Sequence, residues 1–198
     1  MAASKRRSLA LRFCVDRPGG LSYYDGLSYY ERHLPHWQPQ GAALFVTWRL
    51  YGSLPKDTPL GGKFAVVDRQ LDLAATGPQW LADERVAQGV WDALAYGEKQ
   101  LELYRLRAWV LMANHVHILV YPQAPLPRIT KAVKNYSARQ ANAILGRTGQ
   151  PFWQDESYDR WVRGPSELEK IVRYIERNPV AAGLVDSVEK WRWSSAYL

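Results

Sequence analysis

The sequence has a single cysteine, no long apolar run and fewer acidic than basic residues. Cys14 stands alone among 198 residues, so no intramolecular disulfide and no cysteine-rich zinc module can form. No stretch approaches the roughly 20 apolar residues that span a bilayer, and the N-terminus has no apolar segment of the secretory type. Acidic residues number 19 against 26 lysines and arginines, which gives a formal charge of +7. We therefore expect a soluble, cytoplasmic protein that attracts polyanions such as nucleic acids.

The hydrophobic content, 47% of the residues, is enough for one folded domain with a proper core. Apolar and β-branched runs predict strands over residues 42–51, 104–112, 115–121 and 158–163. Helical spacing and end signals predict helices over residues 64–75, 78–99, 128–145 and 167–178, the last ended by Pro179. This order predicts an α+β fold close to ferredoxin-like, an antiparallel sheet with helices packed on one face.

The first 41 residues lack clean periodicity. They contain two identical short fragments, residues 21–24 and 27–30, that are too brief to establish a structural repeat. We predict an irregular N-terminal arm of unknown role over residues 1–41, followed by the main domain over residues 42–198.

Two histidines inside an apolar run are the first candidate site. His115 and His117 are separated by one residue, and in a strand such residues point to the same face. Two neutral imidazoles side by side on a strand make half of a divalent-metal site that needs one or two more nitrogen or oxygen ligands. The alternative is a pair of buried core histidines that are simply hydrogen-bonded.

The last predicted helix carries a second candidate group. Tyr174 and Asn178 are four residues apart, so they lie on one helical face one turn from each other. A tyrosine can be a nucleophile toward phosphorus, and an asparagine amide oxygen can bind a hard cation such as Mg²⁺ or Mn²⁺. Alternatively, Tyr174 is one of twelve ordinary tyrosines and Asn178 is a residue near a helix end.

Several segments in the same order resemble a known family. They are residues 109–119 around the histidine pair, 152–154, 174–185 and the closing 191–195. Together they resemble the single-tyrosine HUH transposases and, within that family, the REP-associated tyrosine transposases of bacteria. The resemblance covers about residues 42–195 and leaves the N-terminal arm without a counterpart.

The resemblance implies a function and a set of site residues. His115, His117 and Asn178 match the family's metal ligands, for Mg²⁺ or Mn²⁺, and Tyr174 matches the nucleophile. The implied reaction is an ATP-independent transesterification of single-stranded DNA beside hairpin-forming REP-like repeats, through a 5′-phosphotyrosine intermediate. The implied setting is the bacterial nucleoid, with the protein acting as a monomer or a homodimer.

Basic residues after the second histidine are candidates for a DNA surface, although they also suit a solvated helix face. They are Arg128, Lys131, Lys134, Arg139, Arg160 and Arg163. Tyr136, on the same predicted helix, is the alternative nucleophile, although no ligand-type residue follows it four positions on. Two other functions remain open from the residues alone: a non-catalytic nucleic-acid-binding protein on this fold, and a metal-dependent nuclease in which water attacks.

Overall fold

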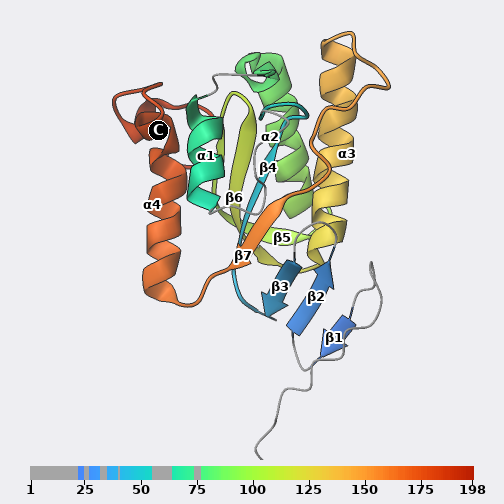
Figure 1. Cartoon of the computed structure of the whole chain (residues 1–198), viewed down its shortest axis with the longest axis vertical. Coiled ribbons are helices and arrows are strands. Elements are labelled where there is room, and N and C mark those ends of the chain that lie inside the picture. Colours follow the sequence, from blue (N-terminus) through green and yellow to red (C-terminus); the bar gives the residue numbers. More distant parts are fainter. Residues whose placement is uncertain (1–21, 25–26, 32–34, 40, 55–63, 74–76) are drawn as a thin grey trace, which may run out of the picture.

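The main element of the fold is a four-stranded antiparallel sheet (Figure 1). The computed structural model describes residues 22–24, 27–31, 35–39, 41–54, 64–73 and 77–198. The four strands are β4 (Leu44–Arg49), β5 (Tyr104–Leu111), β6 (His115–Pro122) and β7 (Tyr158–Trp161). Their order across the sheet is β5-β6-β4-β7, in which the first strand in sequence lies between the third and the fourth. This is the strand order of a ferredoxin-like core.

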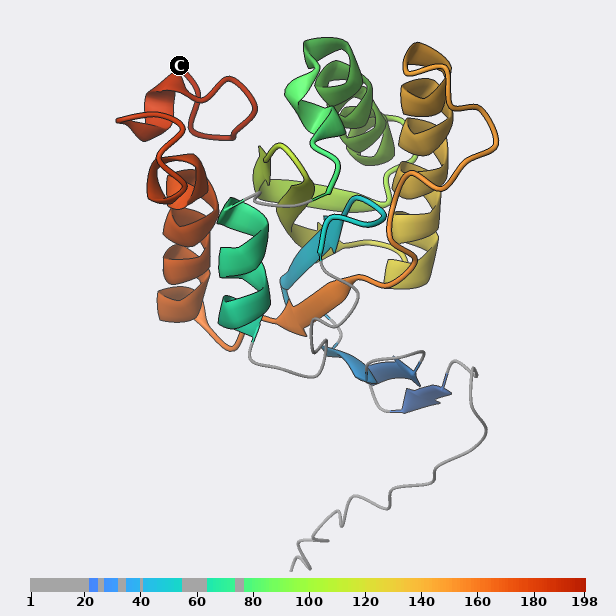
Figure 2. The same cartoon turned by 45° about the horizontal axis from the view of Figure 1, so that its top comes forward.

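Helices cover both faces of this sheet. The helices are α1 (Phe64–Leu73), α2 (Glu84–Lys99), α3 (Leu126–Ile144) and α4 (Pro165–Ala181), with 3₁₀ turns at Trp80–Ala82 and Val188–Lys190. Figures 1 and 2 both show α2 and α3 as one pair and α1 and α4 as another pair. The predicted α+β class and antiparallel sheet are confirmed. The α2–α3 pair packs on one face as expected, whereas α1 and α4 lie on the other face, which we did not expect.

The alternation of strand residues explains the two faces. Val116, Ile118 and Val120 of β6 point into a large apolar cluster with the buried sides of α2 and α3. The intervening Leu119 belongs to a smaller cluster with Ile171 and Ile175 of α4. The histidines share the face of Leu119, so the pair lies on the α1–α4 side of the sheet.

Helix α4, which carries Tyr174, is longer than predicted. Pro179 lies inside it, and the helix runs on to Ala181. A proline near the end of a helix removes one hydrogen bond, yet the Ala182 N–H still bonds to the Asn178 carbonyl at 2.9 Å. Gly183, at a φ of 72°, then ends the helix in the left-handed conformation that glycine adopts without a steric penalty.

The C-terminal residues line the outer edge of β5. The Leu111 N–H donates to the Trp193 carbonyl at 2.8 Å, and the Ser195 N–H donates to the Trp109 carbonyl at 2.9 Å. The Trp191 indole N–H also donates to the Leu111 carbonyl at 3.0 Å. An edge strand that would otherwise present unpaired backbone groups is therefore covered.

The predicted N-terminal arm is not wholly irregular. Strands β1 (Ser22–Tyr24), β2 (Leu27–Glu31) and β3 (Pro35–Pro39) form a separate antiparallel sheet in the order β1-β2-β3. The two identical fragments pair with each other, because Ser22 is opposite Tyr29 and Tyr24 is opposite Leu27. Strand β3 lies near β7 (Figure 1). Residues 1–21 of the predicted arm lie outside the described residues.

The helices of the described part of the chain are too short or too polar to cross a membrane.

Candidate active site

The two histidines of β6 meet at their Nε2 atoms. His115 and His117 are fully buried, and their Nε2 atoms lie 3.1 Å apart. Two nitrogens at adjacent positions around one metal ion, each with a bond of about 2.1 Å, would be roughly 3 Å apart. The spacing therefore matches two ligands of a shared cation.

The ring of His115 is held in one tautomer. Its Nδ1 lies 2.7 Å from Asn114 Oδ1, and the Asn114 Nδ2 donates to the Leu71 carbonyl at 3.0 Å. Because that second bond fixes which end of the amide is oxygen, Asn114 Oδ1 must accept a proton from His115 Nδ1. The Nε2 atom of His115 is then a lone-pair donor directed at the neighbouring imidazole.

The ring of His117 is held from the adjacent strand. Thr47 of β4 lies directly opposite His117 in the sheet, and its Oγ1 is 2.7 Å from His117 Nδ1. A hydroxyl can donate or accept, so Thr47 is compatible with either tautomer of His117. Burial lowers the pKa of His115 to about 3, and burial together with the neighbouring His115 lowers the pKa of His117 well below 6.5. Both rings are therefore neutral at physiological pH, as metal ligands must be.

Helix α1 brings two carboxylates to the same place. Asp68 Oδ1 lies 3.3 Å from His117 Nε2, and Asp72 Oδ1 lies 3.5 Å from His115 Nε2. Asp68 is only 2% exposed, and none of the described residues donates a hydrogen bond to its Oδ1. Burial and the charge of Asp72 raise the pKa of Asp68 to about 8, and burial raises the pKa of Asp72 to about 6. Two carboxyls with such environments need a nearby cation to ionise fully.

Helix α4 supplies the third group. Asn178 Nδ2 lies 3.4 Å from His117 Nε2, and its Oδ1 is buried with no hydrogen-bond donor among the described residues. A half-turn of this amide would place its oxygen toward the histidine pair. One turn away, the half-exposed Tyr174 packs edge-on against His117, with ring centroids 5.7 Å apart, and against Phe45 at 6.0 Å.

These side chains fit a divalent cation. Two imidazole nitrogens and a carboxylate oxygen surround one point, and a half-turn of the Asn178 amide would add its oxygen to them. These are ligand types for Mg²⁺ and Mn²⁺. Orphaned buried oxygens on Asp68 and Asn178 have no other described partner. The donor set is therefore consistent with a metal centre beside Tyr174.

Four residues of this site were predicted from the sequence, and two were not. His115, His117, Tyr174 and Asn178 meet in the structure, whereas Tyr136 lies on α3, on the opposite side of the sheet. Asp68 and Asp72 were not anticipated. Their spacing of four residues was the available signal, since it places both carboxylates on one face of a helix.

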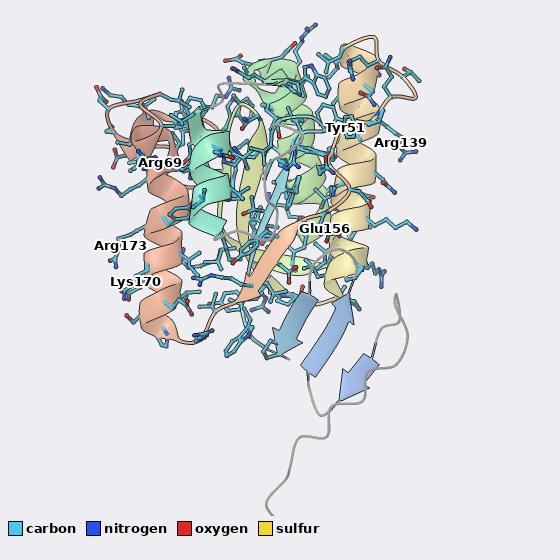
Figure 3. The ribbon with its side chains drawn as sticks, in the orientation of Figure 1. Tyr51, Arg69, Arg139, Glu156, Lys170 and Arg173 are labelled. Atoms are coloured by element: carbon cyan, nitrogen blue, oxygen red, sulfur yellow. The ribbon has the colours of Figure 1, made fainter. Side chains whose placement is uncertain are left out.

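The predicted basic residues fall into two groups. Arg128, Lys131 and Arg139 are exposed on α3, and Arg139 projects from its outer side (Figure 3). Lys134 instead donates to the carbonyls of Gln154 at 2.7 Å and Asp155 at 2.8 Å, so it ties α3 to the segment before β7.

The second basic group lies at the start of α4. The Arg160 guanidinium forms an ion pair with Glu167 at 2.9 Å, and the Arg163 guanidinium lies over the Trp161 ring at 5.7 Å. Further cations, Lys170 and Arg173, are exposed on α4 itself (Figure 3). Basic side chains therefore line both α3 and the helix that carries Tyr174.

Comparison with one solved structure supports the fold. The chain is similar to a REP-associated tyrosine transposase solved bound to a REP hairpin, with a TM-score of 0.56 and 17% identity over 83% of this chain and 82% of that one. It is also similar to a candidate transposase from Deinococcus radiodurans R1, with a TM-score of 0.42 and 23% identity over 69% of this chain and 89% of that one. A search of curated proteins found no match.

Comparison with family models gives a direct assignment. The model described as "Transposase IS200 like" matches residues 79–178, which is half of the chain. The matched range begins before α2 and ends at Asn178, so it contains the histidine pair, Tyr174 and Asn178. The chain therefore belongs to the IS200-like transposase family.

Proposed function

We propose that this protein is a metal-dependent endonuclease and strand transferase for single-stranded DNA, and that Tyr174 is its nucleophile. The observation that carries the proposal is the position of Tyr174, which packs against His117 one helical turn from Asn178. Family membership supports DNA cleavage in transposition. The structurally similar transposase was solved with a REP hairpin, and this supports hairpin-forming repeats as the DNA partner.

The proposed reaction is a transesterification. The Tyr174 phenolic oxygen attacks the phosphorus of the scissile phosphodiester, the bond to the 3′ oxygen breaks, and that oxygen leaves as a 3′-hydroxyl with the proton that the phenol releases. The product is a 5′-phosphotyrosine link. Attack on this link by another 3′-hydroxyl reverses the step and joins strands. One phosphodiester is exchanged for another, so no ATP is consumed.

The proposed cation site consists of His115, His117 and Asn178. A bound Mg²⁺ or Mn²⁺ supplies Lewis-acid activation and orientation of the phosphate. The contribution of the chain is to hold neutral imidazoles at a fixed spacing and to keep the nucleophile on a rigid helix one turn from the third ligand. Tyr174 is 38% exposed, so a DNA phosphate can approach it from solvent.

The DNA strand needs cations along its path. The exposed side chains of Lys170 and Arg173 on α4 flank the nucleophile, while Arg128, Lys131 and Arg139 offer a second basic surface on α3. Lys134, Arg160 and Arg163 already have contacts within the protein, so we assign them a smaller share of phosphate binding.

A covalent-trapping gel tests the proposal. The full chain is incubated with labelled single-stranded DNA carrying a REP-like hairpin, with Mg²⁺, with Mn²⁺ or with EDTA, and the products are separated under denaturing conditions. We expect a metal-dependent protein–DNA adduct that Tyr174→Phe abolishes. Tyr136→Phe is the matched control, because it removes the same hydroxyl from the other side of the sheet, and it should leave the adduct intact.

The same gel distinguishes the other two functions. Metal-dependent cleavage without any adduct would show that water attacks and that the protein is a nuclease. Binding of the hairpin on a parallel native gel, with neither cleavage nor adduct on the denaturing gel, would indicate a non-catalytic DNA-binding protein. Persistence of the adduct in Tyr174→Phe would contradict the assignment of the nucleophile.

A further inference from the structure

We propose that α1 completes the metal centre: Asp68 is a direct ligand, Asp72 adds a second negative charge that balances the divalent ion, and the mixed nitrogen and oxygen ligand set selects Mn²⁺ over Mg²⁺. The inference rests on the proposed function, because it concerns the same cation. It adds two residues from a helix outside the residues that the family model matches, since α1 ends at Leu73 and the match begins at residue 79.

The first argument is position. Asp68 and Asp72 are one turn apart on α1, and each places a carboxylate oxygen near the Nε2 of a different histidine, at 3.3 Å from His117 and 3.5 Å from His115. One ligand atom each from Asp68, His115 and His117 lies within 4.8 Å of the others. The carboxylates therefore approach the two imidazoles on their lone-pair side, where a cation would lie.

The second argument is the cost of burying these groups. Asp68 is almost fully buried, and none of the described residues donates a hydrogen bond to Asp68 Oδ1 or Asp72 Oδ1. The adjacent imidazoles are held neutral by burial, so they offer no positive charge. A buried carboxylate without a partner is strongly unfavourable, and a divalent cation at the histidine pair would compensate both carboxylates at once.

The third argument concerns the orphaned amide across the site. The Asn178 amide approaches from α4 with its Nδ2 at 3.4 Å from His117 Nε2, and its Oδ1, within the described part of the chain, also lacks a donor. A half-turn of the amide would direct that oxygen at the histidine pair. Histidine, aspartate and asparagine ligands from β6, α1 and α4 thus converge on one point. Four protein ligands would leave about two positions of a six-coordinate ion for phosphate oxygens.

The chemistry of this set favours one class of cation. Carboxylate and amide oxygens suit Mg²⁺ and Mn²⁺ alike, whereas imidazole nitrogens suit transition metals. Mn²⁺ accepts both ligand types, and Mg²⁺ gives up its water reluctantly to nitrogen donors. A site with two imidazoles and a buried carboxylate should therefore bind Mn²⁺ more tightly than Mg²⁺.

The test measures binding of Mn²⁺ alone to the full chain after the protein has been stripped of metal. Free Mn²⁺ is followed by its electron paramagnetic resonance signal during the titration. Loss of an outer ligand partner typically lowers metal affinity by 10- to 100-fold, so we expect Asp68→Asn to lose about 100-fold or more and Asp72→Asn about 10-fold. Asp92→Asn, on the exposed side of α2, is the matched control and should bind as the wild type does.

Thermal unfolding gives a second readout that a purely structural role would not produce. Without metal, Asp68→Asn removes a buried unpaired carboxyl, so we expect it to unfold at the same temperature as the wild type or higher. Added Mn²⁺ should raise the unfolding temperature of the wild type and not that of the variant. Asp68→Ser repeats the test should the asparagine variant not fold.

The outcomes separate this inference from the proposed function. If Asp68→Asn binds Mn²⁺ like the wild type while His117→Ala does not, Asp68 is outside the centre and only this inference fails. If His117→Ala also binds normally, the histidine pair is not the metal site and both fail. Displacement of Mn²⁺ by an equal concentration of Mg²⁺ would overturn the assigned selectivity.

Discussion

The two faces of the main sheet are built from the same strands and have opposite character. On the α2–α3 face, Val116 and Ile118 of β6 enter a large cluster of buried apolar side chains. On the α1–α4 face, the residues between and beside them, His115 and His117, lie among two carboxyls and an amide. Neighbouring positions of one strand thus serve either packing or chemistry, according to the face they reach.

The difference shows where the fold can accommodate polar groups. The apolar face is close-packed, and burial of this kind is the main source of folding free energy. The histidine face has a smaller apolar cluster with Ile171 and Ile175, and beside it buried oxygens that lack donors among the described residues. These polar positions contribute little to stability until a cation binds. Consecutive residues of β6 should therefore respond to substitution in different ways.

The largest effect should separate His117 from Ile118. We expect His117→Ala to abolish adduct formation, a loss of about a thousandfold or more since a metal ligand of the reaction is removed, with the chain still folded. Ile118→Ala should instead lower the free energy of unfolding by about 2–5 kcal/mol and leave adduct formation per folded molecule unchanged at low temperature. Denaturant unfolding and the trapping gel, run on both variants, provide the measurement. Equal effects of the two variants on stability would remove the distinction between the faces.

A smaller effect should come from Thr47, which holds His117 from the adjacent strand. Thr47→Val keeps the shape of the side chain and removes the hydroxyl that lies 2.7 Å from His117 Nδ1. When Nε2 binds a cation, the proton resides on Nδ1, where the Thr47 hydroxyl can accept it. We expect Mn²⁺ affinity to fall by about 10- to 100-fold, measured by the same titration. An unchanged affinity would show that the Thr47 hydroxyl does not support His117 as a metal ligand.

The smallest effect concerns pH in metal-free protein. The pKa of Asp68 is raised to about 8 in the folded chain, so between about pH 6.5 and 8 the folded state holds a proton that the unfolded state, with a carboxyl pKa near 3.9, has released. The free energy of unfolding should therefore fall, by about 1 kcal/mol, as pH rises through this window. Below about pH 6.5, His115 and His117 make the free energy of unfolding rise with pH, because their lowered pKa values mean that they gain protons only in the unfolded state.

Denaturant unfolding at several pH values in EDTA measures this slope. Asp68→Asn cannot titrate at this position, so its stability should not fall between pH 6.5 and 8, and the histidines should make it rise slightly. An identical slope in the variant would show that another group is responsible.

Much of the fold follows from local patterns, and the site follows only in part. The spacing of His115 and His117 on a strand places both side chains on one face, and the spacing of Tyr174 and Asn178 does the same on a helix. The sequence alone therefore indicated both the histidine half and the tyrosine half of the site. The spacing of Asp68 and Asp72 also places two groups on one helical face, but acidic residues on an amphipathic helix usually face solvent, so their place in the site was missed. Only the packing of α1 beside α4 turns that face inward (Figure 2).

Two other deviations have a similar origin. Pro179 was expected to end α4, but the helix continues to Ala181 and Gly183 ends it. Lys134 was expected at a DNA surface, but its ammonium group contacts the backbone of the segment before β7. Lys134 is thus used by a tertiary contact that its sequence neighbours do not reveal, whereas Pro179 is accommodated because it lies in the last turn of α4.

The covering of β5 by the C-terminal residues has a consequence for how copies of this protein work together. Helix α4 is joined to β7 at its start, and the segment after it is bonded along β5, so Tyr174 is held against the histidines of its own chain. In this structure both halves of the site thus come from one copy. If the proposed cleavage uses this arrangement, its rate should scale in direct proportion to the amount of protein and not with its square.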